Sequence, residues 1–233
     1  MKKERIINFI KLVVILFLFF NLSSVIVYLL KEFGINTSIF NGKDVAYLNA
    51  LIELILFGVV YLLYHKKIKD DFDKLKLNSK DSVSKIFNYF ALFLGIKIGF
   101  ALITGVLSAL LGLEVTSSEN QTVIDSITNN APLMMLISTS LLAPFVEEGI
   151  FRLGIKNVVK NKYAFILISG LIFGFMHIFP TDLVLYEALI QSIVYVAMGV
   201  YLAYIYSETD NIWISIIVHG LNNLLSMAAL LLF

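Results

Sequence analysis

The sequence predicts an all-α, polytopic transmembrane bundle of about seven spans, with eight as the alternative count. Hydrophobic residues make up 59% of the 233 residues, and the mean hydropathy is +0.87, which is far above the level of a soluble domain. The apolar residues fall in runs long enough to cross a bilayer, which takes about 20 residues in a helix. The chain has no cysteine, which excludes disulfides, thiolate metal ligands and a cysteine nucleophile.

Seven segments have the length and composition of membrane spans: about 6–30, 46–64, 86–111, 131–154, 163–179, 183–206 and 212–233. The first begins like a secretory signal, but its apolar run is too long for one, so we expect a retained helix. We interpret 1–233 as one integral membrane domain. Within it, 1–112 supplies N-terminal helices and a cytoplasmic loop, and 131–225 is a motif-bearing core with a cavity between its helices.

The basic residues predict which loops share a side of the membrane. Fourteen lysines and arginines lie before the first segment, between the second and third, and between the fourth and fifth, whereas the opposite loops hold only Lys31 and Lys43. By the positive-inside rule, the N-terminus is cytoplasmic. In the 66–85 loop, Ile68, Phe72 and Leu75 have helical spacing. This stretch is either an amphipathic helix on the inner leaflet or a solvated charged loop.

Two adjacent glutamates interrupt the fourth apolar segment, in the sequence LLAPFVEEGIFRLGI. A charged side chain at the bilayer centre costs about 2.5–3.5 kcal/mol on insertion scales, so such residues usually mark a site. Arg152 follows Glu148 at the i, i+4 spacing that favours an ion pair, and we expect it to hold Glu148. Glu147 lies about 100° round the helix. It has no local partner and is free to face a cavity as a general base.

Two histidines lie in later apolar segments. His177 shares a helix face with Phe173, and His219 shares one with Asn223. A lone buried histidine is usually held by an interhelical hydrogen bond, but a buried glutamate pair also needs partners, so we interpret these groups as one site. Counted at about 1.5 Å per residue, His177 lies nearly 20 Å from the inner end of its segment, and His219 only 10–12 Å from its own.

Three further ionisable residues in the spans are interpreted as structural. Glu53 and Lys97, in the second and third segments, are expected to form an ion pair or to reach the interfaces separately. Lys11 lies close enough to the inner end of the first segment to extend its ammonium to the interface.

Three short motifs lie in separate apolar segments: Glu147-Glu148-x-x-x-Arg152, Phe173-x-x-x-His177 and His219-x-x-x-Asn223. In this order they resemble the motifs of the CPBP family of intramembrane proteases. That family includes the type II CAAX prenyl endopeptidases and bacterial bacteriocin-processing or immunity proteins. Each motif is short, but the order matches and no motif position departs from the pattern. The resemblance covers roughly residues 131–225.

The resemblance implies an intramembrane endopeptidase in which Glu147 activates water with His177 beside it. His219 and Asn223 would stabilise the oxyanion of the tetrahedral intermediate. The implied supporting residues are Glu148, Arg152 and Phe173. The chain offers no cysteine or serine in a context typical of a nucleophile, which agrees with this reading.

Metal dependence is a separate question. Glu147, His177 and His219 could form a His₂Glu zinc set with one open position. The sequence contains no HExxH motif, however, and the three ligands would come from three helices. The family has been described both as metalloproteases and as metal-independent glutamate enzymes, and the metal-free mechanism is favoured here, with zinc as the alternative cofactor.

The expected substrate is a membrane-embedded or lipidated peptide or protein tail, in a site that opens towards the cytoplasmic leaflet. Phe151, Phe173 and Phe175 are expected to help line an apolar cavity that keeps competing water ordered. The net charge of +1 gives no reason to expect nucleic acid. The lysine- and isoleucine-rich composition suggests a bacterium, where a bacteriocin or signalling-peptide precursor fits better than a prenylated protein. The alternatives are a non-catalytic immunity or regulatory protein that binds a peptide or sensor protein, and a small transporter or proton relay. Transporters often show internal repeats, and none is visible here.

Overall fold

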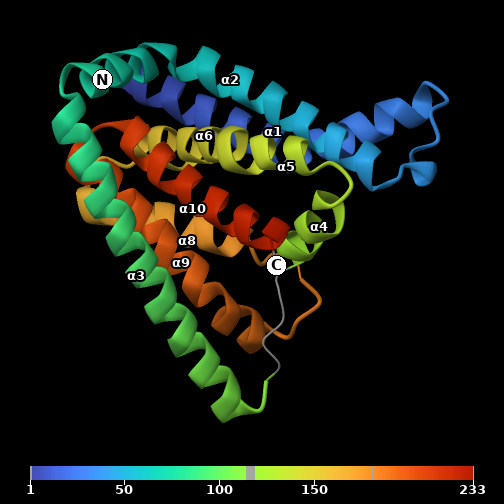
Figure 1. Ribbon diagram of the computed structural model, residues 1–233. Helices are drawn as coiled ribbons and strands as arrows, with labels where there is room; N and C mark the ends of the chain where they lie inside the picture. The colour runs from blue at the N-terminus through green and yellow to red at the C-terminus, as the bar shows by residue number, and fades with distance from the viewer. Residues whose placement is uncertain (1, 114–118, 180, 233) are drawn as a thin grey trace.

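The computed structural model describes residues 2–113, 119–179 and 181–232, and helices are the only regular secondary structure in these ranges. The α-helices pack into one bundle (Figure 1). They are α1 (Lys2–Glu32), α2 (Gly42–Leu77), α3 (Ser79–Leu111), α4 (Glu119–Thr128), α5 (Pro132–Ile137), α6 (Ala143–Glu148), α7 (Ile155–Val158), α8 (Lys162–Met176), α9 (Leu185–Thr209) and α10 (Ile212–Leu232). A short 3₁₀ turn, η1 (Thr37–Ile39), lies between α1 and α2.

The helices α5, α6 and α7 form one continuous rod, Pro132–Val158. They are joined through two π-helical segments, η2 (Ser138–Leu142) and η3 (Gly149–Gly154). The rod and five other helices (α1, α2, α3, α9 and α10) are long and apolar enough to cross a membrane, and α8 is a shorter apolar helix of 15 residues. Each of the seven predicted segments overlaps one of these helices, although six of them and not seven qualify as spans and α2 extends well beyond 64. The chain is a multi-pass membrane protein.

The lysine-rich stretch 66–85 differs from its prediction, because it is neither a loop nor a separate surface helix. It forms the end of α2 and the start of α3, which are separated only by Asn78. No proline or glycine interrupts the stretch, and the i, i+4 pair between Lys67 and Asp71 supports the helix. Ile68 is 3% exposed and lies in the core. The stretch expected to be a loop is therefore helical except at Asn78, and its place on the cytoplasmic side stays a prediction.

The end of α2 also fixes the start of α10. Asp71 is fully buried, and its Oδ2 accepts a hydrogen bond of 3.0 Å from the backbone N–H of Ile212. The side-chain amide of Asn211 donates to the Asp71 carbonyl at 2.8 Å. Because the first N–H groups of a helix need acceptors, this contact sets the height of α10, and with it the position of His219 two turns along.

Two glycines allow α8 and α9 to pack backbone against backbone. A Cβ on Gly170 would lie 2.7 Å from the Cα of Val200, and Gly174, one turn later, is as crowded by α9. This small-xxx-small pattern is common where membrane helices approach closely. The close packing holds the end of α8, which carries His177, beside Tyr195 of α9.

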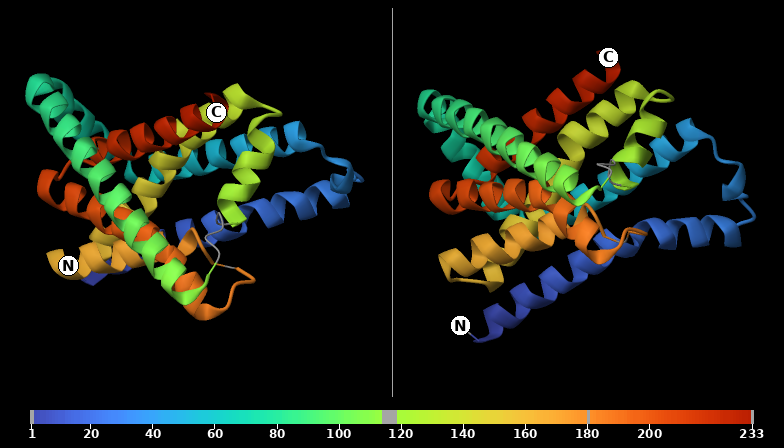
Figure 2. Two further views of the ribbon diagram at one scale, coloured as in Figure 1. Left: turned by 60° about the horizontal axis from the view of Figure 1, so that its bottom comes forward. Right: turned by 90° about the horizontal axis from the view of Figure 1, so that it is seen from below.

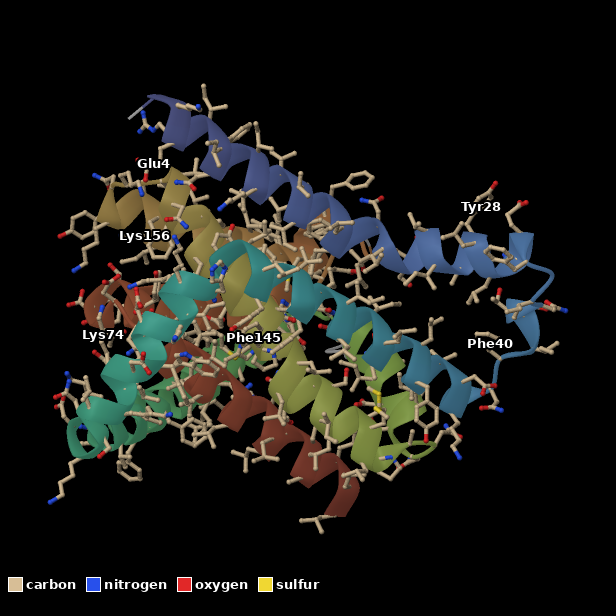
Figure 3. The ribbon with its side chains drawn as sticks, turned by 90° about the horizontal axis from the view of Figure 1, so that it is seen from above. Glu4, Tyr28, Phe40, Lys74, Phe145 and Lys156 are labelled. Carbon is tan, nitrogen blue, oxygen red and sulfur yellow. The ribbon has the colours of Figure 1, made fainter. Side chains whose placement is uncertain are left out.

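The predicted basic clusters lie at the same end of the bundle. Figure 3 shows Glu4, Lys74 and Lys156 near one end, and Tyr28 and Phe40 at the other. The second view of Figure 2 shows α1 along the outer edge of the bundle. Only 6% of the apolar window of α1 is buried, as is typical of a helix that faces lipid. The cellular side of the basic end stays a prediction.

Candidate active site

The two adjacent glutamates lie at the end of α6, between the π-helical segments η2 and η3. A π-helical turn holds an extra residue, and such turns are frequent at functional sites. Pro144 lies in the first turn of α6, where its missing N–H leaves one fewer bond back to η2. Glu148 is fully buried, whereas Glu147 is partly buried, with 14% of its side chain exposed.

Glu148, Arg152 and Ser169 form a closed group that we term the inner ion cluster. The guanidinium donates to both carboxylate oxygens of Glu148, from Nε at 2.9 Å and from Nη2 at 3.2 Å. Its Nη1 donates to the hydroxyl of Ser169 at 2.5 Å, and this hydroxyl donates to the Phe151 carbonyl at 2.7 Å. All three side chains are fully buried. The ion pair predicted between Glu148 and Arg152 is present, and Ser169 of α8 completes it.

His219 lies between the two glutamates. Its Nδ1 is 3.2 Å from Glu148 Oε1, within hydrogen-bond distance, and its Nε2 is 3.8 Å from Glu147 Oε2, which is too long for a direct bond. A carboxylate paired with arginine can only accept, so Nδ1 carries a proton and donates to it. The edge of the ring meets Phe173, at 5.5 Å between centroids. The imidazole is therefore held by α6 and α8, with Nε2 directed toward Glu147.

His177 is the C-cap of α8 and not an internal residue of the helix. Its Nδ1 is 2.8 Å from the carbonyl of Phe173. A carbonyl only accepts, so Nδ1 donates and Nε2 keeps a lone pair. The ring stacks on Tyr195 at 5.0 Å between centroids and 14° between planes, and it contacts the Phe173 ring at 4.6 Å. The orientation of His177 is thus fixed from two sides.

Asn223 connects α10 to the rod. Its Nδ2 donates to the Thr139 carbonyl at 2.9 Å, and its Oδ1 accepts from Nδ2 of Asn222 at 3.0 Å. These two bonds determine which end of the amide is the nitrogen. They also leave one N–H of Asn223 without a partner among the residues that the structure describes.

A cavity of about 410 Å³ brings the four predicted catalytic side chains together. Glu147, His177, His219 and Asn223 all line it. The carboxylate oxygen Oε2 of Glu147 is buried and, within the described part of the chain, has no hydrogen-bond partner. This environment differs from that of Glu148, although the two residues are neighbours in sequence.

The three phenylalanines expected to line the cavity have different positions. Phe173 lines the cavity. Phe151 lies behind Phe173, with 6.0 Å between ring centroids. Phe175 faces a separate apolar groove between α3, α8 and α9. The prediction is therefore wrong for Phe151 and Phe175, because successive residues of a helix point in different directions.

The possible zinc ligands do not gather around one point. Within the ranges 2–113, 119–179 and 181–232, no group of three histidine, aspartate or glutamate side chains is placed to hold a metal ion. His177 and His219 each direct Nδ1 to a protein acceptor. The side chains Glu147, His177 and His219 thus share a cavity without forming a three-ligand set.

The ion pair predicted between Glu53 and Lys97 is absent. Lys97 Nζ donates to Oδ1 of Asn222 at 3.0 Å and to the hydroxyl of Ser226 at 3.2 Å, and its side chain lines the cavity. Glu53 Oε2 is buried with no hydrogen-bond partner in the described ranges. The sequence analysis did not predict that Lys97 lines the cavity, although a lysine in an apolar segment with no acid nearby in sequence indicated a possible role there. Ser169 and Tyr195 gave no such signal.

Comparisons with known proteins cover the part of the chain that carries this site. Residues 129–225 match the family described as type II CAAX prenyl endopeptidase Rce1-like, and every residue from Glu147 to Asn223 falls inside this match. The chain belongs to the CPBP family. No solved structure matches it significantly.

Two bacterial relatives of this CPBP-family protein are informative. The chain is 36% identical over 109 residues to the Bacillus subtilis protein named "Putative membrane peptidase YdiL", covering 46% of the chain and 41% of that protein. It is 30% identical over 185 residues to UPF0177 protein YvdC of Lactococcus lactis, covering 76% of the chain and 66% of that protein. The matches therefore span from about two fifths to about two thirds of these relatives.

Proposed function

We propose that this CPBP-family protein is an intramembrane endopeptidase that hydrolyses a peptide bond in a membrane-embedded or lipidated peptide or protein tail. The observation that carries the proposal is Oε2 of Glu147, which is buried, has no hydrogen-bond partner among the described residues, and lies at a cavity shared with His177, His219 and Asn223. The names of the matching family and of the Bacillus subtilis relative describe peptidases, which supports the same reaction class. The bacterial relatives favour a bacterial peptide precursor as substrate.

Glu147 is proposed as the general base. Its Oε2 lies 3.8 Å from His219 Nε2, and a water molecule beside them would contact Glu147 directly. Oε2 takes one proton of that water as the water oxygen bonds to the scissile carbonyl carbon. The lone pair on His177 Nε2 accepts a hydrogen bond from the second proton and orients the attack. A positioned general base of this kind contributes about 10²–10⁴-fold to the rate.

Two groups are proposed to stabilise the oxyanion that forms at the carbonyl oxygen. The spare N–H of Asn223 is one donor, because its other bonds to Thr139 and Asn222 already fix the amide. His219 is the second donor when it is protonated, since Nδ1–H then donates to Glu148 and Nε2–H points into the cavity. Fixed donors of this type stabilise developing charge without reorganisation of the site.

Collapse of the tetrahedral intermediate completes the hydrolysis. Glu147 returns the proton to the amide nitrogen, the C–N bond breaks, and the products are a carboxylic acid and an amine. The acid then gives its remaining proton to the amine or to solvent and becomes a carboxylate. The inner ion cluster takes no part in these bond changes. Its proposed role is to hold His219 through Glu148, so that Nε2 keeps its direction. No step is routed through a metal ion.

A panel of membrane-peptide precursors, incubated with the purified protein in nanodiscs, tests the proposal. Wild type is compared with Glu147→Gln and His219→Ala, each with and without a chelator. Glu187→Gln is the matched control, because it removes an acid of α9 that bonds its neighbour Tyr186 and does not line the cavity. We expect cleavage by wild type and by the control, none by the two site variants, and no effect of chelation.

Two other results would change the conclusion. Cleavage that chelation abolishes and zinc restores would overturn the metal-free mechanism. Precursors that bind equally to wild type and Glu147→Gln, with no cleavage by either, would overturn the enzyme proposal in favour of a non-catalytic immunity or regulatory protein.

A further inference from the structure

We propose that Lys97 forms an anion subsite of the cavity, which binds a carboxylate of the substrate two to three residues from the bond that is cut. This inference rests on the proposed peptidase function. It assigns a specificity-determining residue to the substrate side of the site, outside the residues that perform the chemistry.

The ammonium of Lys97 is held in place by neutral groups. It donates to Asn222 Oδ1 at 3.0 Å and to Ser226 Oγ at 3.2 Å, and both partners line the same cavity. No carboxylate in the described part of the chain forms an ion pair with it. A lysine ammonium has three donors and no acceptor, so one N–H remains for a ligand. Two neutral hydrogen bonds orient the charge but leave it uncompensated.

Lys97 lies near the middle of an apolar helix, where an unpaired charge is unfavourable. Lys97 lies 18 residues after Ser79 and 14 before Leu111, the ends of α3, or about 27 and 21 Å from them. A charge at such depth is costly unless it is paired or functional. Lys97 also lines the cavity that holds Glu147 and His219, so a peptide bound in that cavity can bring an anionic group to it.

Lys11 shows the ordinary alternative for a lysine in a membrane helix. Its Nζ reaches the Leu63 carbonyl, at 3.4 Å, on the neighbouring helix α2, and it does not line the cavity. The two lysines therefore differ in surroundings, although both lie in apolar helices. Lys11 provides a matched control for the removal of an intramembrane charge.

The helix α10 gives the distance between the subsite and the reaction centre. Asn222 and Ser226, which hold Lys97, follow His219 by three and seven residues, so they lie about 4.5 and 10 Å farther along the helix. An extended peptide advances about 3.3 Å per residue. A carboxylate on Lys97 would therefore lie two to three residues from a peptide bond at His219. Both a free C-terminus and an aspartate or glutamate side chain supply this group.

A synthetic peptide set distinguishes these two sources. Apolar nonapeptides carry one glutamate or its glutamine match at each position in turn, and each sequence is made with a free C-terminus and with a carboxamide. The full-length protein in nanodiscs cleaves them, and mass spectrometry gives the site and rate. The readout is the ratio of rates for acidic and neutral partners within one variant, which loss of folded protein does not change.

For wild type we expect a ratio of about ten or more when the carboxylate lies two to three residues from the cut. Lys97→Met should reduce the ratio to about one, Lys97→Arg should restore it, and Lys97→Glu should favour matched lysine-containing peptides. Lys11→Met should keep the wild-type ratio. A preference for free C-termini alone identifies the terminal carboxylate as the ligand, and a preference for internal glutamate identifies the side chain.

The experiment distinguishes an error in the subsite proposal from an error in the peptidase proposal. Cleavage that requires Glu147 but shows equal rates for acidic and neutral partners would overturn the subsite alone. A ratio that Lys97→Met leaves unchanged would do the same. If no peptide in the set is cut in a Glu147-dependent manner, the peptidase proposal fails and the subsite fails with it.

Discussion

The inner ion cluster and the cavity each contain one of two adjacent glutamates, and the two carboxylates have opposite surroundings. Glu148 accepts from Arg152 and His219 and is fully buried, whereas Glu147 keeps a buried oxygen with no partner in the described ranges. Unsatisfied buried groups destabilise a fold and persist mainly where function requires them. The comparison teaches that the cluster maintains the shape of the site, while the cavity retains groups that are able to react.

The largest expected effect comes from changing the carboxylate in the cavity. Glu147→Gln should reduce the cleavage rate by about a thousandfold, because an amide cannot take a proton from water. It should not lower the unfolding temperature, since the amide nitrogen can take the place of Oε2, which has no hydrogen-bond partner among the described residues. Cleavage assays and thermal unfolding in the same nanodiscs measure both. A variant that unfolds at a clearly lower temperature would contradict the contrast between the two regions.

The next largest effect comes from removing the cation of the inner ion cluster. Arg152→Met leaves the carboxylate of Glu148 buried without its cation, which should cost about 3–5 kcal/mol in the free energy of unfolding. Adding Glu148→Gln removes the unpaired charge and should recover part of that loss. Denaturant unfolding of the two variants gives the difference. If the double variant is no more stable than Arg152→Met, the ion pair is not the source of the stability.

A smaller effect concerns the hydroxyl that completes the cluster. Ser169→Ala leaves Nη1 of Arg152 and the Phe151 carbonyl without their shared partner, so we expect a loss of about 1–2 kcal/mol in the free energy of unfolding. Ser207→Ala is a suitable control, because the Ser207 hydroxyl is buried without a partner in the described ranges. Equal losses in both variants would show that the hydrogen bonds of Ser169 add nothing.

The smallest expected effect sharpens the comparison within the cavity. Tyr195→Leu removes the ring that stacks on His177 and should lower the cleavage rate about fivefold, or about 1 kcal/mol, the value of an aromatic pair. Tyr195→Phe retains the ring and should retain the stacking. The rate constant at saturating substrate is the informative quantity, because the stacking orients His177 during the reaction. A similar loss in both variants would assign the effect to the hydroxyl.

Local features of this site could be predicted from the sequence, and long-range ones could not. The pair of Glu148 with Arg152 follows from their i, i+4 spacing, and the seven apolar segments follow from hydropathy. The contact of His219 with Glu148 joins residues 71 positions apart and depends on how α10 is capped by α2. The depths counted for His177 and His219 assumed that the helices run parallel from one inner surface, so they did not predict that both side chains line one cavity.

The lysines show the same division. Residues 66–85 contain no proline or glycine, and this absence favoured continuous helix. The prediction gave more weight to the high density of charged residues. Lys97 was expected to pair with Glu53 or to reach an interface by itself, because only its charge was considered. The neutral acceptors Asn222 and Ser226 become its neighbours only when α3 packs on α10.

The two π-helical segments of the rod have an evolutionary consequence. Each wide turn accommodates an additional residue in an otherwise α-helical rod. In a regular α-helix one residue more or fewer would turn everything beyond it by about 100°, whereas a wide turn takes up the extra residue locally. A codon gained or lost in η2 can therefore leave Glu147 and Glu148 facing as they do, so this is a place where the chain length can change without loss of the site.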